Sequence, residues 1–341
     1  MLKRLFVVLI PFFLAILLLG NLIFFSFLQL KPKQGDNALY ILKADSIPSL
    51  NQQLSAKLTF VSNFTVRIAM SLLLDESKLR DGKYAIDAEM TAFQLVKNLR
   101  NGHQSEVKLI IAKSRNFENF EAKIKQSIHI SSQNLITVLD SVAVLDITTR
   151  NSVPQSYLGL IIPETHRLYW NCSNRILSRK LKDAYLKFWN AARKEKAAKL
   201  GLSRYEVMIL ASIVEEETSL ESDKPRIASV YYNRLRKGMR LQADPTIIFA
   251  WQDYSIHRVL NKHLEIDSPY NTYRKAGLPP APICIPSISS IDAVLTMPLS
   301  IDFYFCADPS FNGSHIFTSN YTDHLKNAHA YQAAYRQRFD K

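Results

Sequence analysis

A long apolar stretch opens the pattern of hydrophobic and polar positions. Residues 5–29 contain no charged side chain, and Lys3 and Arg4 stand directly before them. As a helix rising about 1.5 Å per residue, this stretch would extend roughly 37 Å, enough to cross a hydrocarbon core of ~30 Å. We expect an uncleaved signal-anchor rather than a cleaved signal peptide, because no small-residue cleavage site follows. Residues 1–4 would be a cytoplasmic tip, and the rest of the chain would lie outside the cytoplasm, on the periplasmic face of the membrane.

The pattern then shortens to the periods of strands and helices. A polar linker is predicted at 30–37 and a small α+β unit at 38–105. Within this unit, extended apolar runs indicate strands, and apolar positions recurring at helical spacing indicate helices. The predicted strands are 38–42 and 82–86, and the predicted helices are 47–57, 63–74 and 91–100.

A larger mixed α+β domain is predicted at 106–341. It opens with a strand at 107–112, which two short amphipathic helices at 117–127 and 133–140 follow. The pattern then predicts one long charged amphipathic helix at 175–200, with Gly201 as its stop.

The next helix is the best specified in the chain. Ser203 and Glu206 have the spacing of a capping box, which fixes where the helix begins. At about 100° per residue, one face of this helix is apolar and consists of Val207, Leu210, Ala211 and Val214.

Three consecutive glutamates end this helix. Glu217 falls about 50° from the centre of the apolar face, whereas Glu215 and Glu216 fall about 110° and 150° away, toward solvent. Burial beside apolar side chains raises the pKa of a carboxyl group, as a general acid that works near neutral pH requires. The alternative is a solvated helix end, which three glutamates in a row usually indicate. The helical phase therefore selects Glu217 as the candidate acid.

Polar and aromatic side chains are concentrated after this helix. A second helix, capped by Ser222 or Asp223, leads to a polar turn at 242–244, and a Tyr-Asn-Thr-Tyr cluster follows at 270–273. Amide and hydroxyl groups beside aromatic rings suit a carbohydrate, whose hydroxyls need donors and acceptors and whose faces need flat apolar surfaces. No glycine-rich phosphate loop, HExxH or GxSxG motif occurs, which excludes the usual nucleotide, zinc-protease and serine-hydrolase assignments.

Composition and charge change this picture little. The chain of 341 residues has 43 basic and 30 acidic residues, a net charge of +13 that suits an anionic partner. The basic residues are dispersed over solvated helix faces and form no nucleic-acid motif, so no nucleic-acid partner is expected.

We expect neither a metal nor a cofactor. Cys172, Cys284 and Cys306 lack the close spacing of a zinc site or a disulfide framework, so we interpret all three as small buried side chains. The spacing of His315, His324 and His329 likewise fits no common metal site.

Four spaced motifs resemble the endolytic murein transglycosylase (MltG/YceG-like) family. They are ASIVEEET at 211–218, IASVYYNRLRKGMRLQADPTIIFA at 227–250, SPYNTYRKAGLPPAPI at 268–283 and FNGSHIFTSNYTDH at 311–324. The resemblance covers most of residues 80–335. It implies the α+β architecture of that family: one N-terminal transmembrane helix, a small LysM-like module and a catalytic domain.

The resemblance also implies an activity. Members of this family cleave the β-1,4 bond between N-acetylmuramic acid and N-acetylglucosamine in peptidoglycan without water, leaving a 1,6-anhydro end, and are thought to end glycan polymerisation. The last acid of the family's motif is Glu217 here. By the same resemblance, the residues that would line the substrate cleft are Asn233, Gln242, Asp244, Tyr270, Asn271 and Thr272. Peptidoglycan strands, the membrane and peptidoglycan synthases are the partners that it suggests.

Two other functions stay open. If Asp244 acted as a nucleophile or as the base for a water molecule, the enzyme would be a hydrolysing muramidase, because ordinary glycosidases use two carboxylates. The small module, the anchor and the basic surface would serve a catalytically silent, glycan-binding scaffold of the cell-wall machinery equally well.

Overall fold

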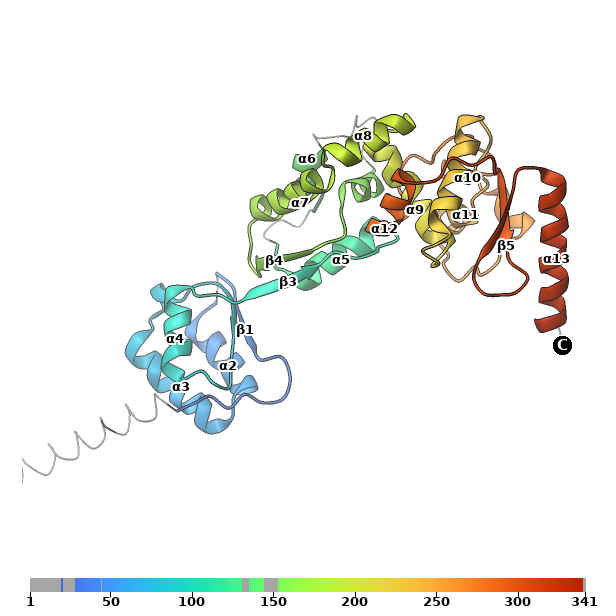
Figure 1. Cartoon of the computed structure of the whole chain (residues 1–341). Coiled ribbons are helices and arrows are strands. Elements are labelled where there is room, and N and C mark those ends of the chain that lie inside the picture. Colours follow the sequence, from blue (N-terminus) through green and yellow to red (C-terminus); the bar gives the residue numbers. More distant parts are fainter. Residues whose placement is uncertain (1–19, 21–27, 44, 131–134, 144–152, 340–341) are drawn as a thin grey trace, which may run out of the picture. The chain divides into compact units, whose positions relative to one another are not determined.

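The computed structural model divides the chain into two compact units (Figure 1). It describes residues 20, 28–43, 45–130, 135–143 and 153–339. Nearly all of the predicted signal-anchor at 5–29, and the tip at 1–4, lie outside these residues. In the part of the chain that is described, no helix has both the length and the apolar character needed to cross a membrane.

The first unit surrounds one small core. Strand β1 (Ala38–Ile41) pairs antiparallel with β2 (Gly82–Ala85), so that Leu39 lies opposite Tyr84. Its helices are α2 (Ile47–Lys57), α3 (Phe60–Leu73) and α4 (Ala92–Asn101), with a 3₁₀ turn η1 (Glu76–Lys78). The helices predicted here are confirmed within three residues at each end.

Helix α4 shows why these boundaries could be predicted. The Thr91 side chain accepts a hydrogen bond from the backbone N–H of Gln94, and the Gln94 side chain accepts one from Thr91 N–H. Gly102 ends the helix at φ 72°, a left-handed conformation that glycine adopts without steric cost.

Segments from outside the predicted module complete this unit. Leu30 is only 1% exposed and belongs to its core, so the segment 30–37 begins inside the unit and not as a free linker. Residues 127–130 and 167–172 also belong to it. Trp170 packs edge-on against Tyr40 at 5.1 Å between ring centroids, and Asn171 Nδ2 donates to Asp81 Oδ2 at 2.6 Å.

A two-stranded sheet and a series of helices follow along the chain. Strand β3 (Glu106–Ile110) pairs with β4 (Thr165–Tyr169). The helices along this part are α5 (Phe117–Ser127), α6 (Leu135–Ala143), the 3₁₀ helix η2 (Pro154–Leu160), α7 (Asn174–Phe188) and α8 (Ala191–Leu200).

The single helix predicted at 175–200 is wrong, because α7 and α8 are separate. Trp189 leaves the helical conformation at ψ 60°, and its fully buried ring packs edge-on against Phe188 at 5.5 Å. Asn190 then caps α8, since its side-chain oxygen accepts a hydrogen bond from Arg193 N–H at 3.0 Å. Burial of a large aromatic side chain together with a new N-cap outweighs the continuous amphipathic pattern.

Helix α9 (Arg204–Glu217) is the centre of this unit. It packs against α8, α10 (Lys224–Arg236), α11 (Asp244–Trp251) and α12 (Ile288–Leu295), and all of its residues from Val207 to Val214 are buried (Figure 1). The predicted capping box of Ser203 and Glu206 is confirmed. Between Val207 and Val214 the helix is therefore buried on all sides, rather than on a single face.

The C-terminal part adds a hairpin and a long helix. Strands β5 (Tyr304–Ala307) and β6 (His315–Thr318) pair antiparallel, with Phe305 opposite Phe317. Helix α13 (Tyr321–Phe339) contacts both strands, and a 3₁₀ helix η3 (Asn261–Glu265) contacts α11. Helices and short antiparallel strands thus alternate in both units, and the predicted mixed α+β fold class is confirmed.

Candidate active site

A cavity of about 390 Å³ opens at the C-terminal end of α9. Because α9 is buried along its length, the core fixes the position of the last residue, Glu217. The cavity is lined by Glu217, Tyr231, Arg234, Gln242, Asp244, Tyr273, Tyr304, Phe305, Tyr321 and His324. Three of the predicted site residues therefore meet here: Glu217, Gln242 and Asp244.

The surroundings of Glu217 favour the protonated form of its carboxyl group. Its burial raises the pKa of the carboxyl group to about 7, and the negative charge of Asp244 acts in the same direction. Two groups oppose this rise: the Tyr231 hydroxyl, which donates a hydrogen bond to Oε1, and the positive charge of Arg234. A carboxyl group with this pKa can both donate and accept a proton near neutral pH.

Asp244 faces the same cavity from the first turn of α11. Its Oδ1 accepts a hydrogen bond from the Tyr273 hydroxyl, which lowers the pKa of the carboxyl less than its partial burial raises it. Gln242 precedes it at φ 52°, a left-handed conformation that is uncommon for a residue with a side chain. Its side chain is exposed in the cavity, while its N–H donates to the Thr272 carbonyl at 3.1 Å.

Four other predicted site residues support the cavity without lining it. Thr272 Oγ1 accepts from Ala243 N–H at 3.0 Å and thereby holds the turn. Asn271, fully buried, donates to the carbonyls of Leu264 and Ile266 at 2.9 and 2.8 Å.

Asn233 and Tyr270 are the other two of these four. Asn233 donates to the carbonyls of Ser300 and Asp302, both at 2.9 Å, so it fixes the chain before β5. Tyr270 packs on Phe249 at 4.6 Å between ring centroids. None of the four lines the cavity, because their polar groups bond to the protein's own backbone or their rings pack inside it.

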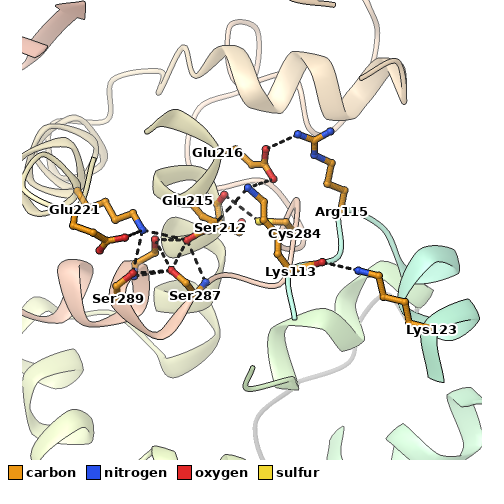
Figure 2. Close-up of polar contacts among 12 residues, drawn as sticks. Lys113, Arg115, Lys123, Ser212, Glu215, Glu216, Glu221, Cys284, Ser287 and Ser289 are labelled. Carbon is orange, nitrogen blue, oxygen red and sulfur yellow. Dashed lines mark hydrogen bonds and ion pairs between the residues drawn. The ribbon is translucent and has the colours of Figure 1, made fainter. Parts of the chain in front are cut away.

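Glu215 and Glu216 do not point to solvent as their helical phase predicts (Figure 2). Both side chains are only 14% exposed. Glu215 Oε2 accepts hydrogen bonds from the hydroxyls of Ser287 and Ser290, at the N-terminus of α12. Glu216 pairs with Lys113 at 2.9 Å and with Arg115 at 3.4 Å. Their contacts come from the loop after β3 and from α12. A helical projection of α9 contains only the residues of α9, so it could not predict these contacts.

Several cavity residues were not among the predicted site residues. Tyr231 and Arg234 lie on α10, within the family motif at 227–250, and the position of Arg234 near the end of this helix, before the polar turn at 242–244, was a signal for it. Tyr304, Tyr321 and His324 come from the hairpin and α13, about a hundred residues after Glu217. The available signal was the family motif at 311–324, which contains Tyr321 and His324.

Among the described residues, no three His, Cys, Asp or Glu side chains are grouped closely enough to hold a metal ion. His315 instead contacts Asp223, with Nδ1 3.0 Å from Oδ2, and His324 stacks on Tyr304. Cys172 and Cys284 are buried thiols as predicted, whereas Cys306 is half-buried.

Known proteins resemble this chain over most of its length. Residues 39–330 match the model of the YceG-like family. The endolytic murein transglycosylase of Bacillus subtilis (strain 168) is 43% identical over 133 residues, which are 39% of this chain and 36% of that protein. The endolytic murein transglycosylase of Streptococcus pneumoniae (strain ATCC BAA-255 / R6) is 30% identical over 219 residues, 62% of this chain and 38% of that protein.

The chain spans less than two fifths of the length of these two curated relatives. A crystal structure of a yceG-like protein from Listeria monocytogenes superposes with a TM-score of 0.55 at 25% identity, over 85% of this chain and 97% of that one. Family and fold thus agree. The chain belongs to the YceG-like family.

Proposed function

We propose that this protein is an endolytic peptidoglycan lytic transglycosylase with Glu217 as its single acid and base. The observation that carries the proposal is the carboxyl group of Glu217, with a pKa of about 7, in a cavity lined by tyrosines and amide and carboxyl groups. Relatives named endolytic murein transglycosylases support the substrate class.

The proposed reaction needs one protein carboxyl and no water. Protonated Glu217 donates its proton to the glycosidic oxygen, and the bond between that oxygen and C1 of the muramyl unit breaks. The 6-hydroxyl oxygen of the same unit forms a bond to C1, while its proton passes to the Glu217 carboxylate. The products are a free 4-hydroxyl on the leaving sugar and a 1,6-anhydro-muramyl end, and Glu217 is again protonated.

Product mass tests this function. Peptidoglycan digested by the full chain should release ends that lack one water relative to reducing ends. Reducing ends would show a hydrolysing muramidase, and no cleavage would favour the glycan-binding scaffold.

Tyr231→Phe should raise the pKa of Glu217 further. The Tyr231 hydroxyl donates to the carboxylate and so favours its charged form. A hydrogen bond to a charged group contributes about 1.5–3 kcal/mol, so we expect the alkaline limb of kcat/KM to move up by about one to two pH units. Tyr232→Phe is the matched control, because that hydroxyl bonds to the Leu200 carbonyl. An alkaline limb that stays in place, or moves down, would contradict the assignment.

Asp244→Asn should shift the same limb the opposite way. The negative charge of Asp244 raises the pKa of Glu217, so its removal lowers that pKa and the activity declines at a lower pH. If Asp244 only orients the substrate, as we propose, the variant still produces anhydro ends, with a rate within roughly tenfold of the parent near pH 6. Complete loss of cleavage would instead favour the muramidase mechanism. The observation in favour of that mechanism is the presence of this second carboxyl group in the cavity.

The cellular setting is also part of the proposal. We propose that residues 5–29 anchor the protein in the cytoplasmic membrane as a single span, with both units on the periplasmic face. The module at 38–105, with its strand-helix-helix-strand order, would be a LysM-like glycan-binding unit. Action on nascent strands beside peptidoglycan synthases would end glycan polymerisation. Protease accessibility of both units in intact spheroplasts, and not in intact cells, is the expected result.

A further inference from the structure

A second hollow in the second unit has a basic lining. Its volume is about 590 Å³. We call it the basic groove, and its lining residues are Lys113, Ser114, Arg115, Asn119, Ala122, Lys123, Gln126 and Tyr254. Three of these eight side chains are cationic, two are amides, and none is acidic. Such a lining favours an anion that also presents hydrogen-bonding groups.

The groove is held in place by its own contacts (Figure 2). Lys113 and Arg115 come from the loop after β3, and Lys123 comes from α5. Lys123 Nζ donates to the Lys113 carbonyl at 2.8 Å and to Ser114 Oγ at 3.1 Å, which ties the loop to the helix. The Arg115 guanidinium lies over the Tyr254 ring, 4.7 Å from its centroid, which restricts its orientation. The groove therefore needs little rearrangement to receive a ligand.

The carboxylates behind the groove leave it positive. Lys113 and Arg115 share Glu216, at 2.9 and 3.4 Å. Glu215 lies 3.9 Å from Lys113, but its closer partners are the hydroxyls of Ser287 and Ser290 and, at 3.6 Å, Lys224. Two cations facing the groove thus share one closely paired carboxylate, and the remaining positive charge attracts an anion.

A smaller cavity adjoins the basic groove and is lined in part by a neighbour of Glu217. It measures about 280 Å³ and shares Arg115 and Tyr254 with the groove. Glu216 and Pro245 line it, whereas their sequence neighbours Glu217 and Asp244 line the catalytic cavity. The end of α9 and the first turn of α11 therefore contribute to both the smaller cavity and the catalytic cavity. A ligand that extends from the groove along the smaller cavity would reach Glu216 and Pro245, the sequence neighbours of Glu217 and Asp244.

We propose that the basic groove binds the carboxylates of the stem peptide carried by the glycan strand that is cleaved at Glu217. This inference rests on the proposed function, since the lactyl group of the muramyl unit at the cleavage site carries such a peptide. The planar Arg115 guanidinium matches a carboxylate with two parallel hydrogen bonds, and the amides of Asn119 and Gln126 match peptide groups. The groove would thereby favour strands that still carry their peptides.

The test compares two substrates for the full chain. One is peptide-bearing glycan, and the other is the same glycan after an amidase has removed the peptides. For Arg115→Gln and for Lys123→Gln, the ratio of kcat/KM between peptide-bearing and peptide-free strands should fall by about tenfold, mainly through KM, as loss of one charge-assisted hydrogen bond predicts. Lys125→Gln is the matched control, because Lys125 is an exposed lysine on α5 that pairs with Glu121 and does not line the groove.

The outcomes separate this proposal from the proposed function. If the ratio is unchanged, or if both substrates lose kcat/KM equally, the groove assignment is overturned. Cleavage by the parent chain would still support the proposed enzymatic function in that case. If the parent chain cleaves neither substrate, binding still decides. Stem peptide with free carboxylates should then bind the parent more tightly than its fully amidated form, and Arg115→Gln should remove that difference. Inorganic phosphate binding as tightly as the peptide would assign the groove to a phosphate and overturn the proposal.

Discussion

Glu217→Gln should lower the rate of peptidoglycan cleavage by about 10²–10⁴-fold, the usual contribution of a positioned general acid. Glutamine has nearly the same shape and can still accept the Tyr231 hydrogen bond, but it has no proton to give at the pH of the reaction. The measurement is the release of anhydro ends from purified sacculi. Glu195→Gln is the matched control, since it makes the same change on the exposed face of α8.

The same substitution should make the second unit more stable at alkaline pH. Glu217 has a pKa of about 7 in the folded protein and an ordinary value of 4.5. Between these values the folded state binds more protons than the unfolded state, so the free energy of unfolding falls as pH rises from about 4.5 to 7. Glutamine carries no charge at any pH and removes this fall, which is on the order of 3 kcal/mol.

Urea unfolding at pH 5 and pH 8 tests whether the free energy of unfolding changes with pH in this direction. The gain in stability of Glu217→Gln over the parent should be small at pH 5 and larger at pH 8, because the parent is destabilised only where Glu217 ionises. A variant that is inactive but shows the same gain at both pH values would mean that Glu217 titrates normally. The raised pKa would then be the wrong explanation for its activity.

Helical phase selected Glu217 from a single apolar face, and Glu217 does line the cavity, but α9 is buried on all sides from Val207 to Val214. Phase alone therefore does not distinguish Glu217 from its two acidic neighbours, which are also largely buried. The directions of Glu215 and Glu216 could not be predicted in this way. Their surroundings come from the loop after β3 and from α12, about 70 to 100 residues away in sequence.

The polar cluster at 270–273 shows a second limit of the pattern. Amides and hydroxyls beside aromatic rings predicted sugar contacts, but Asn271 and Thr272 bond to backbone groups of the protein itself. Buried backbone groups need partners as much as a sugar does, and composition does not distinguish the two. Tyr273, in the same cluster, does line the cavity. The segment therefore reaches the cavity through Tyr273, while the polar groups of Asn271 and Thr272 bond to the protein's own backbone.

Arg234→Met should cost the second unit on the order of 3 kcal/mol of unfolding free energy. Arg234 is 8% exposed, and it donates from Nε to the Phe303 carbonyl at 2.7 Å and from Nη1 to the Leu241 carbonyl at 2.6 Å. One side chain therefore joins the turn that carries Gln242 to the strand that carries Tyr304. Methionine fills similar space but leaves both carbonyls without this donor. Urea unfolding at pH 5, where Glu217 is protonated in the folded state, isolates this loss.

Arg234→Met should also raise the pKa of Glu217 above about 7, because the guanidinium charge lowers it in the parent. Arg236→Met is the matched control, since Arg236 is exposed on the same helix and its bond to the Tyr232 hydroxyl is 3.5 Å long. Arg234→Lys separates the two roles: the ammonium keeps the charge but cannot span both carbonyls. We expect that variant to lose stability while its alkaline limb stays near that of the parent. Only Arg234 bonds to both the Phe303 and the Leu241 carbonyls. If Arg234→Met and Arg236→Met were equally stable, these two hydrogen bonds would contribute nothing to the free energy of unfolding.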